Sequence, residues 1–369
     1  MAVGPAVPFP YVQGLEPQPQ DELAQDFADI MNDLDALQRR ADRIDAGVNF
    51  TEVSTPTNYF TNSWVNYSIG YHQEAQYRRI GDVVELRGMI KSGTIGSAAL
   101  TLPVGFRPGG GHHLFPTDSN ANAHGRVDAQ SDGQIIPRVP ANAYTDIHAR
   151  WSVSEVGVEG WTAVSGGIGF KNSWVNFGGG YAPAAYRRVG DMVEVRGLIT
   201  GGTLNVAAFT LPTGYRPTKT VHFSADSSAV TFGHGELTVE ADGDVIPVSG
   251  SNSYYGLFTM RFSVSPTGTE GWTKVIFGSG WSNYDVSLYV PAEYRLVGDE
   301  VQLRGLVAGG SGTIFTLPEG HRPCREHLWC VDATNAHARV DITSDGQVSL
   351  LAGTSTYLTL SGMHFSVLP

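Results

Sequence analysis

The sequence predicts a mostly β chain of three tandem antiparallel β-sandwich domains of jelly-roll type, preceded by an extended peptide and a short trimeric coiled-coil helix. Composition and internal repetition predict this fold class. Aromatic residues make up 10% of the 369 residues and charged residues only 16%, while 45 glycines and 20 prolines supply turns. Aromatic and β-branched residues favour strands, and glycine and proline favour the turns between them.

The repetition is plain along most of the chain. Similar segments read NSWVNYSIGYHQEAQYRRIGDVVELRGMI (62–90), NSWVNFGGGYAPAAYRRVGDMVEVRGLI (172–199) and GWSNYDVSLYVPAEYRLVGDEVQLRGLV (280–307). Each is followed by a second motif, TLPVGFRP (101–108), TLPTGYRP (210–217) or TLPEGHRP (316–323). A period of this length is the size of a domain. We therefore predict repeat 1 at 47–160, repeat 2 at 161–271 and repeat 3 at 272–369.

Alternation within each repeat predicts strands. In residues 82–88, Val84 and Leu86 fall on one face and Glu85 and Arg87 on the other, which is the period of a half-buried strand. Gly-Asp pairs before this strand and Asp-Gly pairs later in each repeat indicate turns and hairpins. These pairs are Gly81-Asp82, Gly190-Asp191 and Gly298-Asp299, and Asp132-Gly133, Asp242-Gly243 and Asp345-Gly346. No repeat shows a convincing helical period.

The N-terminal part differs from the repeats. Residues 1–20 are rich in proline and are expected to be extended, and residues 21–46 are expected to form a helix with an apolar a/d seam. The seam consists of Leu23, Phe27, Ile30, Leu34, Leu37, Ala41 and Ile44. Leu34 at an a position and Ile30 at a d position favour trimers or tetramers over dimers, so we expect a homotrimer. The alternative is a helix that packs onto its own first β domain.

Charge and motifs limit the function. The net charge is −12 and no run of lysine and arginine occurs, so nucleic acid is not an expected partner. No apolar stretch reaches the length of a membrane-spanning helix, so no membrane insertion is expected. The sequence lacks nucleophile-elbow, metalloprotease and P-loop motifs. We therefore expect no enzyme activity, no catalytic residue and no cofactor.

The repeats resemble a module of bacteriophage tail fibres and minor tail proteins, especially those of actinobacteriophages. The pattern of that module is W-x-N-Y/F, then Y-R-x-x-G-x-V-x-L-R-G, then T-L-P-x-G-Y-R-P. Repeat 1 carries it as Trp64, Asn66, Tyr67, Tyr77, Arg78, Gly81, Leu86, Arg87, Gly88, Leu102, Pro103, Gly105, Phe106, Arg107 and Pro108. The resemblance covers residues 51–369, and His321 in repeat 3 departs from the aromatic residue of the pattern.

This resemblance implies β-sandwiches that are often trimeric, are displayed on a virion and are used in host attachment. Residues 1–20 would dock onto other virion structural proteins, 21–46 would form a neck, and the β domains would stack outward with repeat 3 as the distal tip. The protein would be made in the host cytoplasm and would bind a host cell-surface glycan. The alternatives are a head or tail decoration fibre without essential receptor binding and, third, a cell-wall glycan hydrolase.

Repeat 3 departs most from the others and carries the candidate ligand residues, because binding residues usually lie on variable loops of a rigid scaffold. The candidates are Trp329, Tyr357, His327, Arg325 and His321. Trp329 and Tyr357 would stack on sugar rings. The alternative for Trp329 is a core position, because Phe115 and Phe223 occupy nearby positions of the other repeats.

Recurring residues have a structural and a functional interpretation. The Y-R and L-R-G arginines could bind acidic sugars or phosphates, but their identical placement favours a structural role, such as a bond to the turn residue Asp82. His124, His234 and His337 recur late in each repeat. We expect them on a solvated outer face, at a subunit contact about a three-fold axis where histidines could cluster and even take a metal, or in a ligand site.

The cysteines do not predict a zinc site. Cys324 and Cys330 flank His327, but the spacing between them is not that of a zinc motif and no second cysteine pair exists. We therefore predict no metal site, and expect either two buried thiols or a local loop disulfide.

Overall fold

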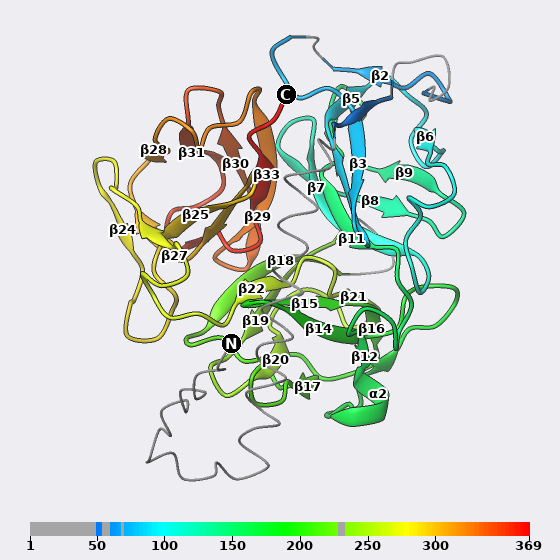
Figure 1. The fold of residues 1–369 in the computed structure, drawn as a ribbon, viewed down its shortest axis with the longest axis vertical. Coiled ribbons are helices and arrows are strands. Elements are labelled where there is room, and N and C mark those ends of the chain that lie inside the picture. The colour runs from blue at the N-terminus through cyan, green and yellow to red at the C-terminus, as the bar shows by residue number, and fades with distance from the viewer. Residues whose placement is uncertain (1–48, 54–59, 68–69, 228–232) are drawn as a thin grey trace, which may run out of the picture.

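The computed structural model describes residues 49–53, 60–67, 70–227 and 233–369 (Figure 1). Within these ranges every regular element is a strand except the single helical turn α2 (Val164–Gly167). A mostly β chain is therefore confirmed. The predicted N-terminal peptide and the coiled-coil helix, with its seam from Leu23 to Ile44, lie outside the described residues.

Each repeat consists of two antiparallel sheets. In repeat 1 the smaller sheet has four strands in the order β1 (Thr51–Glu52), β3 (Gln76–Ile80), β4 (Val83–Arg87) and β11 (Ala149–Ser152). The larger sheet has seven, in the order β2 (Val65–Asn66), β5 (Met89–Lys91), β10 (Thr145–Asp146), β7 (His113–Ser119), β8 (Ala123–Ala129), β9 (Gln134–Arg138) and β6 (Leu100–Thr101).

Repeat 2 has the same topology. Its smaller sheet has the order β12 (Thr162–Ala163), β14 (Ala185–Val189), β15 (Met192–Arg196) and β22 (Arg261–Ser263). Its larger sheet has the order β13 (Val175–Asn176), β16 (Leu198–Thr200), β21 (Tyr255–Gly256), β18 (Val221–Ser227), β19 (Gly233–Val239), β20 (Asp244–Pro247) and β17 (Phe209–Thr210).

Repeat 3 differs in one respect, because its larger sheet is divided. The smaller sheet has the order β23 (Thr273–Lys274), β25 (Glu293–Val297), β26 (Glu300–Arg304) and β33 (His364–Ser366). The counterpart of the larger sheet has a three-stranded part, β24 (Trp281–Asn283), β27 (Leu306–Gly309) and β32 (Leu358–Thr359). Its four-stranded part has the order β28 (Gly312–Thr316), β31 (Gln347–Ala352), β30 (Ala336–Ile342) and β29 (His327–Ala333).

The recurring motif residues build the core and the turns. Trp64 and its equivalents Trp174 and Trp281 are at most 5% exposed. Gly88 of the L-R-G motif has a positive φ of 136°, and a Cβ there would lie 2.5 Å from the Cα of Ala75. Only glycine therefore fits between β4 and β5, where the chain passes this close to a neighbouring backbone.

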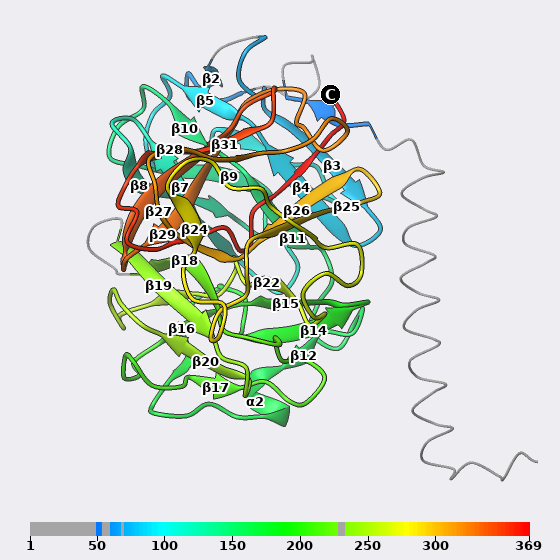
Figure 2. The ribbon, with the colours of Figure 1, turned by 90° about the vertical axis from the view of Figure 1, so that its left-hand side faces the viewer.

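The three repeats pack side by side around a common axis, as Figures 1 and 2 show. The equivalent strands β7, β18 and β29 each contact the other two. Each seam between repeats also has an isolated parallel bridge, joining His112 to Tyr181, Thr220 to Tyr289, and Glu326 to His72. The expected outward stack with repeat 3 as a distal tip is therefore wrong for the described residues. The three repeats are thus arranged about an approximate three-fold axis within one chain.

A ring of buried ion pairs explains why the repeats pack this way. The arginine of each Y-R pair bonds the aspartate of the Gly-Asp turn in a neighbouring repeat. Arg187 pairs with Asp82, Arg295 Nη1 lies 2.8 Å from Asp191 Oδ2, and Arg78 Nη1 lies 2.6 Å from Asp299 Oδ2. The arginine side chains are at most 3% exposed. The structural interpretation of these arginines holds, with the partner on the adjacent repeat.

Residues near the two ends of the described chain complete the ring of contacts between repeats, at the seam between repeats 3 and 1. Between repeats, Trp161 lies under the guanidinium groups of Arg187 and Arg196, and Trp272 occupies the same place in repeat 3. In repeat 1 that place is taken by Phe50, and Arg87 Nη1 donates to the carbonyl oxygen of Leu368 at 2.9 Å. Residues near both ends of the described β region therefore meet at the seam between repeats 3 and 1.

A second ionic cluster lies buried between the three repeats. Arg150 Nη1 donates to Glu194 Oε1, and Arg261 Nη1 donates to Glu300 Oε1, each at 2.5 Å. Burial alone would raise the pKa of Glu194, but Arg187, Arg150 and Arg261 outweigh it and hold that pKa far below its usual range. Mutual compensation of these charges makes their burial between the repeats tolerable.

Candidate functional site

Each repeat presents a cluster of three rings at its seam with the preceding repeat. One ring comes from the W-x-N-Y/F motif, one from the segment that follows it, and one from late in the repeat. The clusters are Tyr67, His72 and Tyr144; Phe177, Tyr181 and Tyr254; and Tyr284, Tyr289 and Tyr357. The three seams therefore share one plan.

Two seams are closed by an arginine from the facing repeat. Arg126 Nη1 donates to the hydroxyl of Tyr254 at 2.6 Å, and Arg126 also pairs with Asp128. Arg339 Nη1 donates to the hydroxyl of Tyr144 at 2.8 Å, and Arg339 pairs with Asp341. The hydroxyls of Tyr254 and Tyr144 are thereby already bound.

The seam between repeats 2 and 3 is different. Glu236 on β19 is the equivalent of Arg126 on β8 and of Arg339 on β30, because all three hold the same position in the strand pairing. The hydroxyl of Tyr357 donates to Glu236 Oε2 at 2.9 Å, and His222 Nδ1 lies 2.5 Å from Glu236 Oε1. No arginine fills the space above these groups among the described residues that line it.

This seam contains an open hollow of about 690 Å³. Its walls include the rings of Tyr284, Tyr289 and Tyr357 from repeat 3, and Glu240 and Asp242 from repeat 2. Volumes of roughly 300–1,000 Å³ with aromatic walls and a few polar groups are typical of small-ligand sites. The hollow therefore has the size and lining of a binding site.

The rim of the hollow is apolar and accessible. Tyr284 is 43% exposed and Leu288 is 58% exposed. The ring of Tyr284 lies 5.6 Å from that of Tyr289 and 5.5 Å from that of Tyr357, measured between centroids. Tyr284 therefore offers an accessible aromatic ring to a ligand in the hollow.

The acidic side of the hollow is electrostatically unusual. Burial raises the pKa of Glu240, and nearby Asp242 and Asp244 raise it further. Beneath the hollow, burial and then the charge of Glu236 raise the pKa of Asp332 to about 9. Burial likewise raises the pKa of the Tyr357 hydroxyl. Burial and the carboxylate of Glu236 therefore both favour the protonated form of Asp332, and burial favours the neutral hydroxyl of Tyr357.

A second, smaller cavity lies where all three repeats meet. It encloses about 100 Å³ and is lined by residues that include Phe115, Phe258, Trp329 and Met363. This volume accommodates only a few water molecules. We therefore place the candidate site in the larger hollow.

The five residues that the sequence predicts to bind a ligand do not lie together in the structure. Tyr357 lies in the hollow, whereas Trp329 is half-buried between His148 and His364 and lines the small cavity. The other three lie elsewhere. His327 is 1% exposed beside His148, Arg325 Nη1 pairs with Glu74 Oε1 at 2.6 Å, and His321 packs edge-on against Tyr294.

Sequence reasoning missed most of the hollow, namely Tyr284, Tyr289, His222 and Glu236. The signal for Glu236 was present, because that position holds arginine in the other two repeats. The tyrosines gave no such signal, since Tyr284 matches the shared W-x-N-Y/F motif. Only the packing of repeat 2 against repeat 3 identifies them as neighbours of Glu236.

No family model matches the sequence, and no curated protein matches it. Among solved structures, the receptor-binding protein gp15 of Listeria phage PSA is similar over part of the chain, with 20% sequence identity and a TM-score of 0.24. The similar part covers 29% of this chain and 65% of that protein, which is less than two thirds of its length. None of the helices in the described part of the chain is long and apolar enough to cross a membrane.

Proposed function

We propose that this chain is a bacteriophage virion fibre that attaches the particle to a host bacterial surface by binding a glycan in the hollow between repeats 2 and 3. The resemblance of the repeat motifs to tail-fibre modules supports the virion assignment. The proposal includes docking through residues 1–20 and trimerisation through residues 21–46. The observation that carries glycan binding is the hollow itself, with tyrosine rings on one side and carboxylates on the other.

Sugar chemistry matches this lining. A pyranose ring has apolar C–H faces, which pack against aromatic rings, and equatorial hydroxyls, which donate to carboxylates. Tyr284 and Tyr289 supply accessible rings, and Glu240 and Asp242 supply acceptors. Strands and the loops between them both line the hollow, and loops on a rigid β scaffold are a usual place for binding residues.

The charge of the hollow restricts the class of glycan that can bind there. Its described lining holds Glu236, Glu240 and Asp242, and it holds no lysine or arginine. A polymer of sugar phosphates or uronic acids would be repelled by these carboxylates. We therefore propose that the ligand is a neutral or amino-sugar glycan.

The test is binding of the full chain to intact bacterial cells and to an array of neutral, amino-sugar and acidic glycans. Y284A should lower binding at least tenfold, because its ring is an exposed wall of the hollow. Tyr67→Ala is the matched control, because Tyr67 holds the equivalent position in repeat 1 at a seam that Arg339 already closes.

Each outcome distinguishes the functions. Saturable binding lost in Y284A but kept in Y67A supports an adhesin with its site in the hollow. Equal binding by both variants would refute the site, and absence of binding to any cell or glycan would favour a decoration fibre. Release of soluble sugar from cell walls would favour the hydrolase.

A further inference from the structure

A cluster of histidines lies buried where the three repeats meet. His124 on β8, His234 on β19 and His337 on β30 each come from a different repeat. The ring of His124 lies 5.5 Å from that of His234 and 5.6 Å from that of His337, measured between centroids. The outer solvated face that the sequence suggested for these residues is therefore wrong, because the packing of the repeats covers them.

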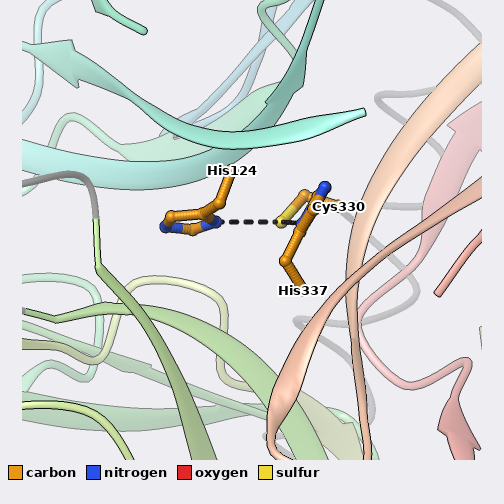
Figure 3. A group of neighbouring side chains, drawn as sticks. All are labelled: His124, Cys330 and His337. Carbon is orange, nitrogen blue, oxygen red and sulfur yellow. Dashed lines mark hydrogen bonds between the residues drawn. The ribbon is translucent and has the colours of Figure 1, made fainter. Parts of the chain in front are cut away.

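Cys330 lies beside His124 and His337 of this cluster (Figure 3). Its Sγ is 3.6 Å from Nδ1 of His124 and 3.3 Å from Nδ1 of His337. Cys330 on β29 is the equivalent of Pro116 on β7 and of Ser224 on β18, because the three residues hold the same position in the strand pairing of their repeats. Only repeat 3 thus places a thiol at this position, and both cysteines are free rather than joined in a disulfide.

These distances suit shared coordination of one ion. Zinc lies about 2.0–2.1 Å from histidine nitrogen and about 2.3 Å from cysteine sulfur. In a tetrahedron, such bonds put the nitrogen and the sulfur about 3.5 Å apart. The observed separations bracket that value, and the three ligand atoms lie within 4.8 Å of one another.

The far side of each ring is held by a buried carboxylate. Nε2 of His337 lies 2.9 Å from Asp118 Oδ1, and Nε2 of His124 lies 3.4 Å from Asp226 Oδ1. Both aspartate side chains have no exposed surface. A carboxylate on the outer nitrogen is the usual partner of a metal-binding histidine, because it fixes the ring with its other nitrogen toward the metal.

We propose that His124, His337 and Cys330 bind a zinc-like transition metal ion, which joins repeat 1 to repeat 3 at the centre of the protein. Two imidazoles and one thiolate favour zinc, cobalt or copper over magnesium or calcium. Metals bind cysteine as the thiolate and histidine as the neutral imidazole, so uptake of an ion here would release protons from these groups.

His234 completes the ring of histidines but is not a member of the ligand set. Its Nε2 lies 3.5 Å from Asp332 Oδ1, and its side chain is 8% exposed. Its ring lies 6.5 Å from that of His337, the longest of the three ring separations. A water molecule or another small ligand would take the fourth position around the ion.

The test measures metal bound by the full chain, made without a metal-binding tag. The purified protein should hold about one zinc per chain by mass spectrometry, and cobalt should replace it with a thiolate-to-cobalt absorption band. C330S and H337A should each lower bound zinc at least tenfold and abolish that band. C330S should still fold, because repeat 2 already carries Ser224 at this position.

Matched controls make the result specific. C324S changes the other cysteine, which is exposed, and should leave both zinc content and the cobalt band unchanged. H234A should keep zinc within threefold, and a loss equal to that in C330S would overturn the three-ligand assignment. Wild-type protein with less than a tenth of an equivalent of zinc, and no cobalt band after reconstitution, would refute the site.

Discussion

The three seams between repeats have one architecture and two chemistries. At two of them, Arg126 or Arg339 reaches across to bond a tyrosine hydroxyl of the facing repeat. At the third, Glu236 stands at the same register position and an open hollow remains. Equivalent positions that keep arginine close the interface, and the position that departs from arginine leaves room for a ligand.

The same contrast applies at the centre of the protein. The ring of Y-R arginines and turn aspartates repeats three times and serves packing. The thiol of Cys330 occurs once and brings new chemistry into a cluster of repeated histidines. In a chain of repeats, shared residues therefore indicate the fold, and departures at shared positions indicate the sites.

Breaking the ring of arginine–aspartate pairs between repeats should have the largest effect on stability. Asp191→Ala removes the partner of Arg295, which bonds it at 2.8 and 3.0 Å and is 3% exposed. An unpaired buried arginine costs roughly 3–5 kcal/mol, so we expect the free energy of unfolding to fall by about that amount. Chemical denaturation measures this loss.

Lys171→Ala is the control for this substitution. Lys171 pairs with Asp244 at 3.6 Å, but its side chain is 49% exposed. An exposed ion pair contributes about 0–1 kcal/mol, so the variant should differ from the wild type by no more than that. Equal losses in the two variants would show that the inter-repeat ring does not hold the repeats together.

Converting the open seam into a closed one sharpens the comparison. Glu236→Arg combined with Thr238→Asp places in repeat 2 the arginine and aspartate that Arg126 and Asp128 provide in repeat 1. The new arginine should bond the hydroxyl of Tyr357 and occupy the hollow. We expect glycan binding to fall at least tenfold while the melting temperature stays within a few degrees.

If this double variant keeps its fold by circular dichroism and still binds the glycan, the hollow is not the binding site. The reverse exchange is its counterpart. Arg126→Glu should open the seam between repeats 1 and 2, whose rings are those of Phe177, Tyr181 and Tyr254, and should leave glycan binding in the hollow between repeats 2 and 3 unchanged.

The sequence predicts the parts of this molecule well and their assembly poorly. Alternation at Val84 and Leu86 and the Gly81-Asp82 turn predict the β3–β4 hairpin, because strand periodicity and turn chemistry are local. The packing of repeats is set by contacts such as Arg187 with Asp82, which are remote in sequence. The expected stack failed because no local pattern reveals which repeat such an arginine faces.

The candidate site was predicted in part for the same reason. Tyr357 was chosen as a departure of repeat 3 and does lie in the hollow, but Tyr144 and Tyr254 hold the equivalent positions in the other two ring clusters. His327 was chosen by the same rule but is buried against His148. A departure in sequence marks a position worth attention, but whether it faces solvent or a neighbouring repeat depends on tertiary packing.

The seam between repeats 3 and 1 should respond to pH through Glu326. Burial, and then the charge of Asp341, raise the pKa of Glu326 to about 7, with Tyr71, His72 and Arg339 also nearby. The folded protein thus binds this proton more tightly than the unfolded chain does. The contribution of Glu326 to stability is therefore full below about pH 4.5 and is lost as the pH rises to about 7.

Glu326→Gln mimics the protonated acid and should remove this dependence. At pH 8 the variant should be about 1 kcal/mol more stable than the wild type, a figure reduced from the full shift because solvent screens the group. Denaturation curves between pH 4.5 and 8 measure the difference. Glu74→Gln, which removes the ion pair with Arg325 at the same seam, is the control and should not reproduce the pH trend.

The smallest effect on stability should follow removal of residues 1–46. All three seams of the β region are formed within one chain, through the bridges at His112, Thr220 and Glu326. The shortened chain should therefore keep its β circular dichroism and its melting temperature within about two degrees. Native mass spectrometry should give one chain for the shortened protein and three for the full chain, because the apolar seam of residues 21–46 is the expected trimerisation element. A trimer that persists without residues 1–46 would place the contact on the β repeats, and a full chain with the mass of one chain would refute the homotrimer.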